Sequence, residues 1–266
     1  MAARERVYKT EAVVLRRRNF GEADSIFTLF SAREGKFEAV ARGVRKARSH
    51  MRGHVEPLTH ARVMVAHGRN LDVLTQAETI HPFRAIREDL ERTAAALYCA
   101  EIIDEISADR VSAPDVYALL LELLAALEAG APCQVMHWFE LNLLALSGYE
   151  VQLDVCASCG ARLPELATVL APAAGGLVCV ACRPLAGAGR LLAVRTIKVL
   201  RFARAASLES FAALRLDGAL SHELQAALGD VIRHTLEREP RAGRHIGDVA
   251  RLPAPVAVPQ PNVETR

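Results

Sequence analysis

The sequence predicts an α+β multidomain protein: an N-terminal five-stranded OB-type β-barrel, an α-helical domain, and a four-cysteine module inserted in the helical part. Five short β-prone runs fill the first eighty residues, and the apolar spacing becomes helical after His81 and Pro82. Two C-x2-C motifs then interrupt the helical pattern. The expected domains are residues 1–80, residues 81–252 with the module at about 154–185, and a disordered Pro-rich tail at 253–266.

The strands of the barrel are expected at residues 12–15, 25–30, 36–42, 61–66 and 71–79. The sequence HGRN, which joins the last two runs, is typical of a hairpin turn. Five short strands with small turns fit a closed OB-type barrel, and an SH3-like barrel is the structural alternative. Phe27 and Phe30 are expected in its core.

Helices are expected from residue 83 onward, where apolar residues recur every three or four positions. The residues that set this spacing are Phe83, Ile86, Leu90, Ala94, Leu97 and Ile102. Further helices are predicted at residues 115–129, 133–147, 193–206 and 222–237. Pro114 marks the start of the first of these four helices, and Gly130 and Gly148 mark the ends of the first and second.

Composition indicates the class of protein. Of the 266 residues, 51% are hydrophobic and 24% charged, which is typical of a soluble globular chain. We expect no signal peptide and no membrane-spanning segment, because no apolar run is long enough for either. A cytoplasmic location is therefore predicted, and six cysteines in a reducing compartment do not form a disulfide framework.

The four cysteines of the inserted module predict a metal site. Cys156 and Cys159 form one C-x2-C motif, and Cys179 and Cys182 form the other. Two such turns place four thiolates around one tetrahedral Zn²⁺. Four sulfur ligands leave no open position, so one structural zinc is expected, and four buried free thiols are the alternative.

Charge is segregated along the chain although the net charge is only +2. Residues 1–80 hold 15 Lys and Arg against 9 Asp and Glu, residues 81–165 hold 5 against 14, and residues 166–208 hold 6 without any acid. This pattern predicts a polyanion-binding surface separate from an acidic one. The acidic block, with Asp104 and Glu105, is expected to face protein partners.

The stretch ARGVRKARSHMRG at residues 41–53 carries five cations and no acid. They are Arg42, Arg45, Lys46, Arg48 and Arg52. A second cationic set recurs every three residues on a predicted helix, in a region without acids. It consists of Arg195, Lys198, Arg201 and Arg204. Each set is either a solvated surface or a contact for a polyanion, and the missing acids favour the contact.

No motif for catalysis is present. The sequence contains no G-x-x-x-x-G-K-[ST], no G-x-S-x-G and no H-E-x-x-H. We therefore expect a protein that binds rather than an enzyme.

Several motifs resemble the N-terminal domain of the RecO recombination mediators. They are FGEAD at 20–24, EGK at 34–36, ARGVRK at 41–46, EPLTHARVMV at 56–65 and GRNLDVLTQAE at 68–78. The resemblance continues through the helical segment and the CASCG and CVAC motifs, so it covers nearly the whole chain except the tail. It implies an OB fold, a helical domain and, in many members, a four-cysteine zinc module.

The resemblance also implies a function in DNA repair without enzymatic turnover. Members bind single- and double-stranded DNA, anneal complementary strands, and act with RecR to load RecA onto strands coated by single-strand-binding protein. No membrane or small-molecule substrate is implied, and the location would be the nucleoid.

The basic stretch at 41–53 would then lie along a phosphate backbone, with Phe20 and Phe37 as candidates for stacking on bases. For Phe20, core packing is an equal alternative. Two other functions stay open: an RNA-binding protein with an OB barrel and a zinc ribbon, and a structural adapter whose acidic helices bind proteins.

Overall fold

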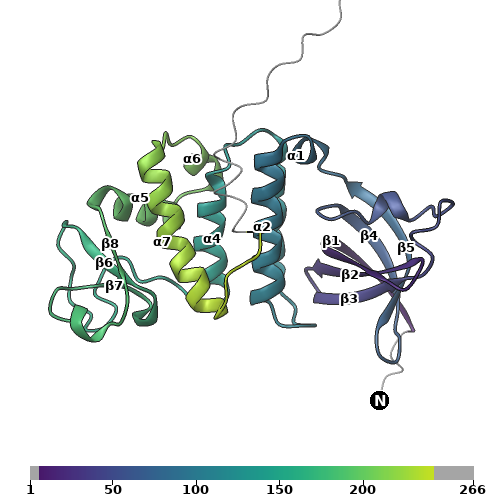
Figure 1. Ribbon diagram of the computed structural model, residues 1–266, viewed down its shortest axis with the longest axis horizontal. Helices are drawn as coiled ribbons and strands as arrows, with labels where there is room; N and C mark the ends of the chain where they lie inside the picture. Colours follow the sequence, from purple (N-terminus) through teal and green to yellow (C-terminus); the bar gives the residue numbers. More distant parts are fainter. Residues whose placement is uncertain (1–5, 243–266) are drawn as a thin grey trace, which may run out of the picture.

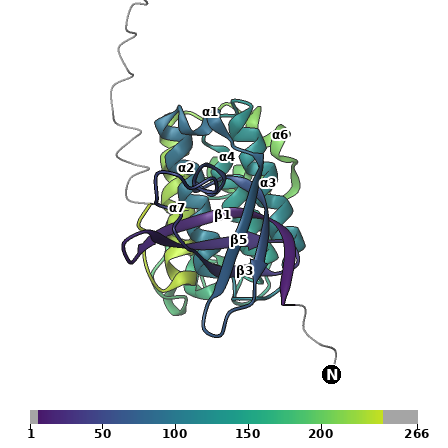
Figure 2. The same cartoon turned by 90° about the vertical axis from the view of Figure 1, so that its right-hand side faces the viewer.

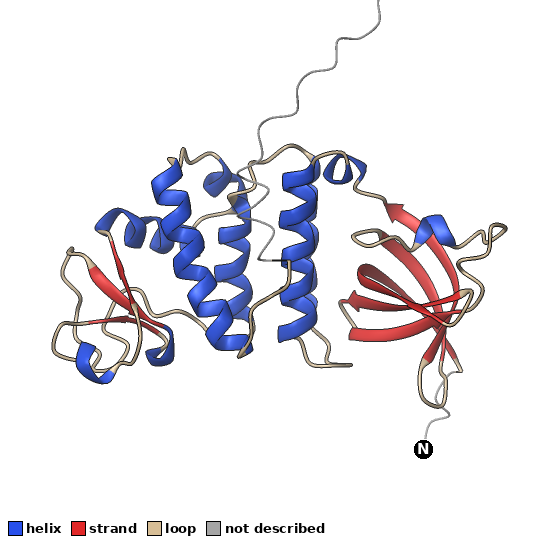
Figure 3. Cartoon of the chain, in the orientation of Figure 1, coloured by secondary structure: helices blue, strands red, loops and turns tan. Residues whose placement is uncertain are grey.

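The computed structural model describes residues 6–242, so the predicted disordered tail at 253–266 lies outside the described residues. Three parts follow one another along the molecule: a β-barrel, a group of helices and a small sheet (Figure 1). The barrel and the small sheet lie at opposite ends, with the helices between them (Figure 3). No helix within residues 6–242 has the length and apolar character needed to cross a membrane.

The predicted five-stranded barrel is confirmed, and it is closed in the order β1-β2-β3-β5-β4. Its strands are β1 (Val7–Phe20), β2 (Asp24–Ser31), β3 (Gly35–Ala41), β4 (His60–Ala66) and β5 (Asp72–His81). The long β1 closes the barrel because its first half pairs with β4 and its second half pairs with β2, with a bulge between Val14 and Arg16.

Two hydrophobic cores hold residues 6–242 together. One lies inside the barrel and includes Phe27, Leu29 and Phe37. The other begins on the barrel wall with Val13 and Phe30 and continues through the helices into the small sheet. The predicted burial of Phe27 and Phe30 is confirmed, since both are 0% exposed. Helices lie behind the barrel when it is viewed from its own end of the molecule (Figure 2).

The predicted helices are present with small changes in their bounds. They are α1 (Arg84–Arg87), α2 (Leu90–Ile106), α3 (Pro114–Glu128), α4 (Val135–Leu146), α5 (Val194–Ala205), α6 (Leu208–Ala212) and α7 (Gly218–Leu236). The first predicted helix is divided in two, because the Asp89 side chain accepts a hydrogen bond from the backbone N–H of Arg92 and caps α2. The short α6 was not predicted, since five residues are too few to show a period.

A small antiparallel sheet in the order β7-β6-β8 was not predicted either. Its strands are β6 (Thr168–Ala171), β7 (Gly176–Val178) and β8 (Arg190–Leu192). Residues 6–242 also form three 3₁₀ turns: η1 (Arg52–His54), η2 (Pro172–Ala174) and η3 (Arg183–Leu185).

The loop between α2 and α3 joins the helices to the barrel. The backbone N–H of Arg110 donates to the carbonyl of Lys36 over 2.8 Å, and that of Ala113 donates to Ala32 over 3.1 Å. Gly35 lies under this loop with φ +59°, and a Cβ there would come within 1.8 Å of the Val111 carbonyl oxygen. The contact therefore requires glycine at position 35.

Gly35→Ala is expected to lower the free energy of unfolding by at least about 2 kcal/mol, because it adds left-handed backbone strain to the clash with Val111. Gly21→Ala is the matched control, since Gly21 has φ +58° but no atom within 4 Å of the added Cβ. Strain alone should cost the control about 1 kcal/mol. Urea denaturation measures both, and equal losses would show that the contact with Val111 contributes nothing.

Candidate nucleic-acid interface and metal centre

Residues 41–53, the basic loop, connect β3 to η1 on the way to β4 and are anchored on the barrel. Val44 is 0% exposed, and Val55 just beyond the loop is also 0% exposed. The backbone N–H of Gly43, at φ +65°, donates to Asp24 Oδ1 over 2.7 Å. The backbone N–H of Arg45 donates to the carbonyl of Ala23 over 2.9 Å. The loop is therefore held in place at its backbone while its long side chains extend from the barrel.

All five cations of the basic loop are exposed. They are Arg42, Arg45, Lys46, Arg48 and Arg52. Within residues 6–242, none of the five forms an ion pair with a carboxylate, and the only polar side-chain contact among them is a 3.3 Å hydrogen bond from Arg45 to the Gly21 carbonyl. Like charges this close repel one another, so the loop gains electrostatic stabilisation when an anion binds.

An exposed aromatic ring lies beside the basic loop. Phe20 is 52% exposed at the end of β1, and the turn that follows it is the one that Arg45 contacts. Phe37 is different: only 2% of it is exposed, and it belongs to the barrel core. The interpretation of Phe37 as a base-stacking residue is wrong, because side chains alternate between the two faces of β3 and that of Phe37 points into the barrel.

The turn between β4 and β5 lies away from the start of the basic loop. Ala39 pairs in parallel with Asp72, so the residues before Asp72 extend toward the start of β3 and not toward Ala41. Asp72 also contacts Tyr8, near the start of β1, and Arg110, in the loop between α2 and α3. The exposed Arg69 of this turn is therefore not part of the basic loop's set of cations.

The cations of α5 are paired with carboxylates, in contrast to those of the basic loop. Arg195 lies 2.6 Å from Asp217, Lys198 lies 2.8 Å from Glu165, and Arg201 lies 3.3 Å from Asp154. Arg204 contacts Asp154 and Glu150, and Arg201 also donates twice to the carbonyl of Leu153.

The argument from missing acids is therefore wrong for α5. Acids are absent only from the local sequence, and in three dimensions they come from residues 150–165 and from Asp217. The two basic sets also do not adjoin, since α5 lies beside the small sheet and the basic loop belongs to the barrel at the other end (Figure 1).

Asp104 and Glu105 are not a free acidic surface. Asp104 lies 3.1 Å from Arg16 and 3.8 Å from Lys36, both on the barrel, and Glu105 pairs with Arg238. Their interpretation as a face for protein partners is corrected, because these carboxylates hold parts of this chain together. The separation of acidic and basic residues along the sequence here reflects ion pairs between different parts of the fold.

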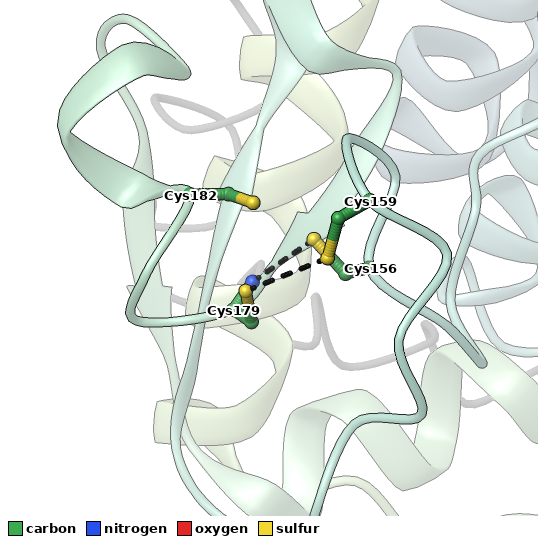
Figure 4. A group of neighbouring side chains, drawn as sticks. All are labelled: Cys156, Cys159, Cys179 and Cys182. Carbon is green, nitrogen blue, oxygen red and sulfur yellow. Dashed lines mark hydrogen bonds between the residues drawn. The ribbon is translucent and has the colours of Figure 1, made fainter.

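The four cysteines of the module converge from two turns (Figure 4). Cys156 and Cys159 precede β6, and Cys179 and Cys182 follow β7. Their ligand atoms all lie within 4.8 Å of one another, and the Sγ atoms of Cys159 and Cys179 are 3.9 Å apart. Gly160, at φ +73°, donates its N–H to the Cys156 carbonyl and closes the first turn.

The cluster fits a tetrahedral metal ion with four sulfur ligands. Metal–sulfur bonds of about 2.3 Å require sulfur atoms about 3.8 Å apart, close to the observed separation. The backbone N–H of Cys179 donates to the Cys156 sulfur over 3.3 Å. This N–H, with those of Cys159 and Ser158, lowers the pKa of the Cys156 thiol to about 6, which favours the thiolate that binds metal.

Two family models together match nearly the whole described chain. Residues 4–83 match the model "Recombination protein O N terminal", and residues 87–245 match "Recombination protein O C terminal". The chain belongs to the RecO family.

Curated RecO relatives resemble the chain over most of its length. The DNA repair protein RecO of Roseiflexus sp. (strain RS-1) is 39% identical over 94% of this chain and 88% of its own. Those of Dehalococcoides mccartyi (strain CBDB1) and Desulforudis audaxviator (strain MP104C) are 36% and 35% identical, over 88% of this chain and 93% and 94% of their own. The chain is thus a RecO family DNA repair protein.

Proposed function

We propose that this RecO family protein is a non-enzymatic recombination mediator. It binds single- and double-stranded DNA, anneals complementary strands, and acts with RecR to load RecA onto strands coated by single-strand-binding protein. The observation that carries the proposal is the basic loop, whose five exposed cations have no carboxylate partner in residues 6–242. The protein acts in the cytoplasm, at the nucleoid.

The DNA-binding domain in this proposal is the barrel, residues 1–80, as an OB fold. A five-stranded Greek-key barrel with nucleic acid bound at its connecting loops is the OB arrangement. Here the β1–β2 turn and the basic loop lie at one end of the barrel, where Ser25 pairs with Ala41 and Arg45 contacts Ala23. Arg42, Arg45, Lys46, Arg48 and Arg52 contact phosphates, and Phe20 stacks on a base.

The module at about 154–185 holds one structural Zn²⁺ in this proposal. Cys156, Cys159, Cys179 and Cys182 supply all four ligands, so no position is left for a substrate or a reactive water. Sulfur donors in two C-x2-C turns are the ligands that Zn²⁺ takes in structural sites. The ion would fix the module onto the helical domain, residues 81–252, in which it is inserted.

The α5 cations stay in the proposal as a second, weaker DNA contact, since phosphate must displace carboxylates from Arg195, Lys198, Arg201 and Arg204. Replacing Arg195, Lys198 and Arg201 by Ala is expected to change the salt dependence of DNA binding by less than one unit in log–log slope. It should also lower the free energy of unfolding by about 1 kcal/mol, because surface pairs and the bonds to Leu153 are lost. Salt titration and urea denaturation measure the two effects. A loss of slope near two units with unchanged stability would make α5 a primary DNA site.

A strand-annealing assay tests the proposed function. Complementary oligonucleotides coated with single-strand-binding protein should anneal faster with the protein than without it, and addition of RecR should permit RecA filaments to form. Excess single-stranded RNA as competitor distinguishes the DNA-binding role from an RNA-binding one. An annealing rate unaffected by the protein, or abolished by this excess of RNA, would contradict the proposal.

A further inference from the structure

A groove of about 410 Å³ lies on the outside of the barrel, between the basic loop and the sheet formed by β1, β4 and β5. The loop forms one wall with His50 and Met51. The facing wall is a row of residues paired across three strands, in which Lys9 pairs with Met64 and Met64 pairs with Gln76. Its size lies within the range of small-ligand sites.

One side of the groove is an open strand edge. Thr79 of β5 donates its backbone N–H to Nδ1 of His54 over 3.2 Å, so this N–H points away from β4. Successive residues of a strand direct their N–H groups to alternate sides. The N–H and C=O of Ala77 therefore face the same side as those of Thr79, toward the groove that Ala77 lines.

The space between the two walls of the groove suits an aromatic ring. Two of the four methionines of the chain, Met51 and Met64, line it, and none of its lining residues is Phe, Tyr or Trp. Thioether sulfur is polarizable and makes favourable contacts with aromatic rings. A planar heteroaromatic ring between these side chains would also find hydrogen-bonding groups in Gln76 and in the backbone of Ala77.

The charge around the groove and the short length of its open strand edge favour nucleic acid over a peptide as the ligand. Lys9 is exposed and has no acid partner within residues 6–242, and the neighbouring loop cations Arg48 and Arg52 have none either. Arg62 lies 2.9 Å from Glu11 and 4.0 Å from Glu78, so it offsets one of these two negative charges, and Lys9 offsets the other. A peptide that bound as an added β-strand would find too short an edge of β5 to pair with, because His54 occupies this edge at Thr79.

We propose that this groove binds one unpaired nucleobase of the strand whose phosphates lie on the basic loop, an inference that rests on the proposed function. The base inserts between Met51 and Met64, and its edge meets Gln76 and the backbone of Ala77. A base in a duplex is stacked and paired and cannot enter. The groove therefore gives the protein a preference for single strands that the cations alone do not supply.

Thr75→Leu fills the groove from its exposed rim, and Met64→Ser removes one wall without filling it; both positions line the groove. The affinity of each full-length variant is measured for a normal oligonucleotide and for an abasic one with the same phosphates. On the normal strand both variants should bind at least about fivefold more weakly than the unmodified protein. On the abasic strand, and on duplex DNA, affinity should be unchanged. Ala125→Leu, on the exposed side of α3, is the control and should change neither.

Equal weakening on normal and abasic strands, or no weakening on either, would overturn the groove assignment. The salt dependence separates this failure from failure of the proposed function. Groove variants should keep the unmodified slope, because they remove no phosphate contact. If the groove assignment fails while removal of the loop cations still lowers the slope, the DNA-binding role of the loop stands.

Discussion

Cys179→Ser is expected to release the metal and to lower the free energy of unfolding by at least about 3 kcal/mol. In a closed four-ligand site, the free energy of metal binding contributes directly to folding. The effect should extend beyond the module, because Leu177 and Val178 of β7 belong to the same core as the helices. Elemental analysis should find about one zinc per chain in the unmodified protein, and calorimetry or urea denaturation measures the loss of stability.

Cys133→Ser is the matched control for the zinc prediction. Cys133 is a half-buried thiol outside the cluster, and burial raises its pKa to about 11, so it stays a thiol. This variant should keep its zinc. Absence of stoichiometric metal from the unmodified protein would remove the zinc assignment altogether.

Replacing Arg42, Arg45 and Arg48 by Ala is expected to weaken single-strand binding by up to about 100-fold at 0.1 M salt. Each phosphate contact on a single strand accounts for roughly 0.7 in the log–log slope, so three contacts contribute about two log units at this salt concentration. The loss should be similar for every sequence, because phosphates carry no sequence information. Stability should change little, since these side chains are exposed and form no ion pair within residues 6–242.

The triple variant of Arg195, Lys198 and Arg201 is the control for the loop variant. It removes the same number of positive charges, but from side chains that already have carboxylate partners. Fluorescence anisotropy with a labelled oligonucleotide compares the two. Equal losses of affinity would show that net charge, and not the basic loop, determines binding.

Features with a short-range signal could be predicted from the sequence. The five strands of the barrel form where the sequence has β-prone runs. The first strand is longer than its run, because β1 pairs with both β2 and β4. The two C-x2-C motifs specify their own turns, so Cys156 and Cys179 are brought together once the chain reverses at Gly175 and Gly176.

Features that depend on long-range packing could not be predicted. The ring of Phe37 points inward because of the register of β3, which a partly alternating run does not reveal. The partners of Arg201 and Lys198 are 47 and 33 positions earlier in the chain, so counting local acids gave the wrong result for α5. Asp104 likewise appeared as part of an acidic block, although its partners Arg16 and Lys36 come from the barrel.

The basic loop illustrates both cases. Its charge was evident from residues 41–53, but its anchoring was not, because a single valine within a polar stretch gives no local signal of burial. Burial of Val44 and the hydrogen bond of Gly43 to Asp24 fix the loop beside Phe20. A fixed array of cations requires less ordering on binding than a mobile loop, which favours affinity for a polyanion.

The most direct test of the central claim is a salt titration of single-strand binding by the unmodified protein and by the variant without Arg42, Arg45 and Arg48. Each Lys or Arg that contacts a phosphate releases condensed counterions, so the slope of log affinity against log salt counts contacts. The slope should become shallower by about two units in the variant. An unchanged slope would contradict the account and leave residues 41–53 as a solvated surface loop.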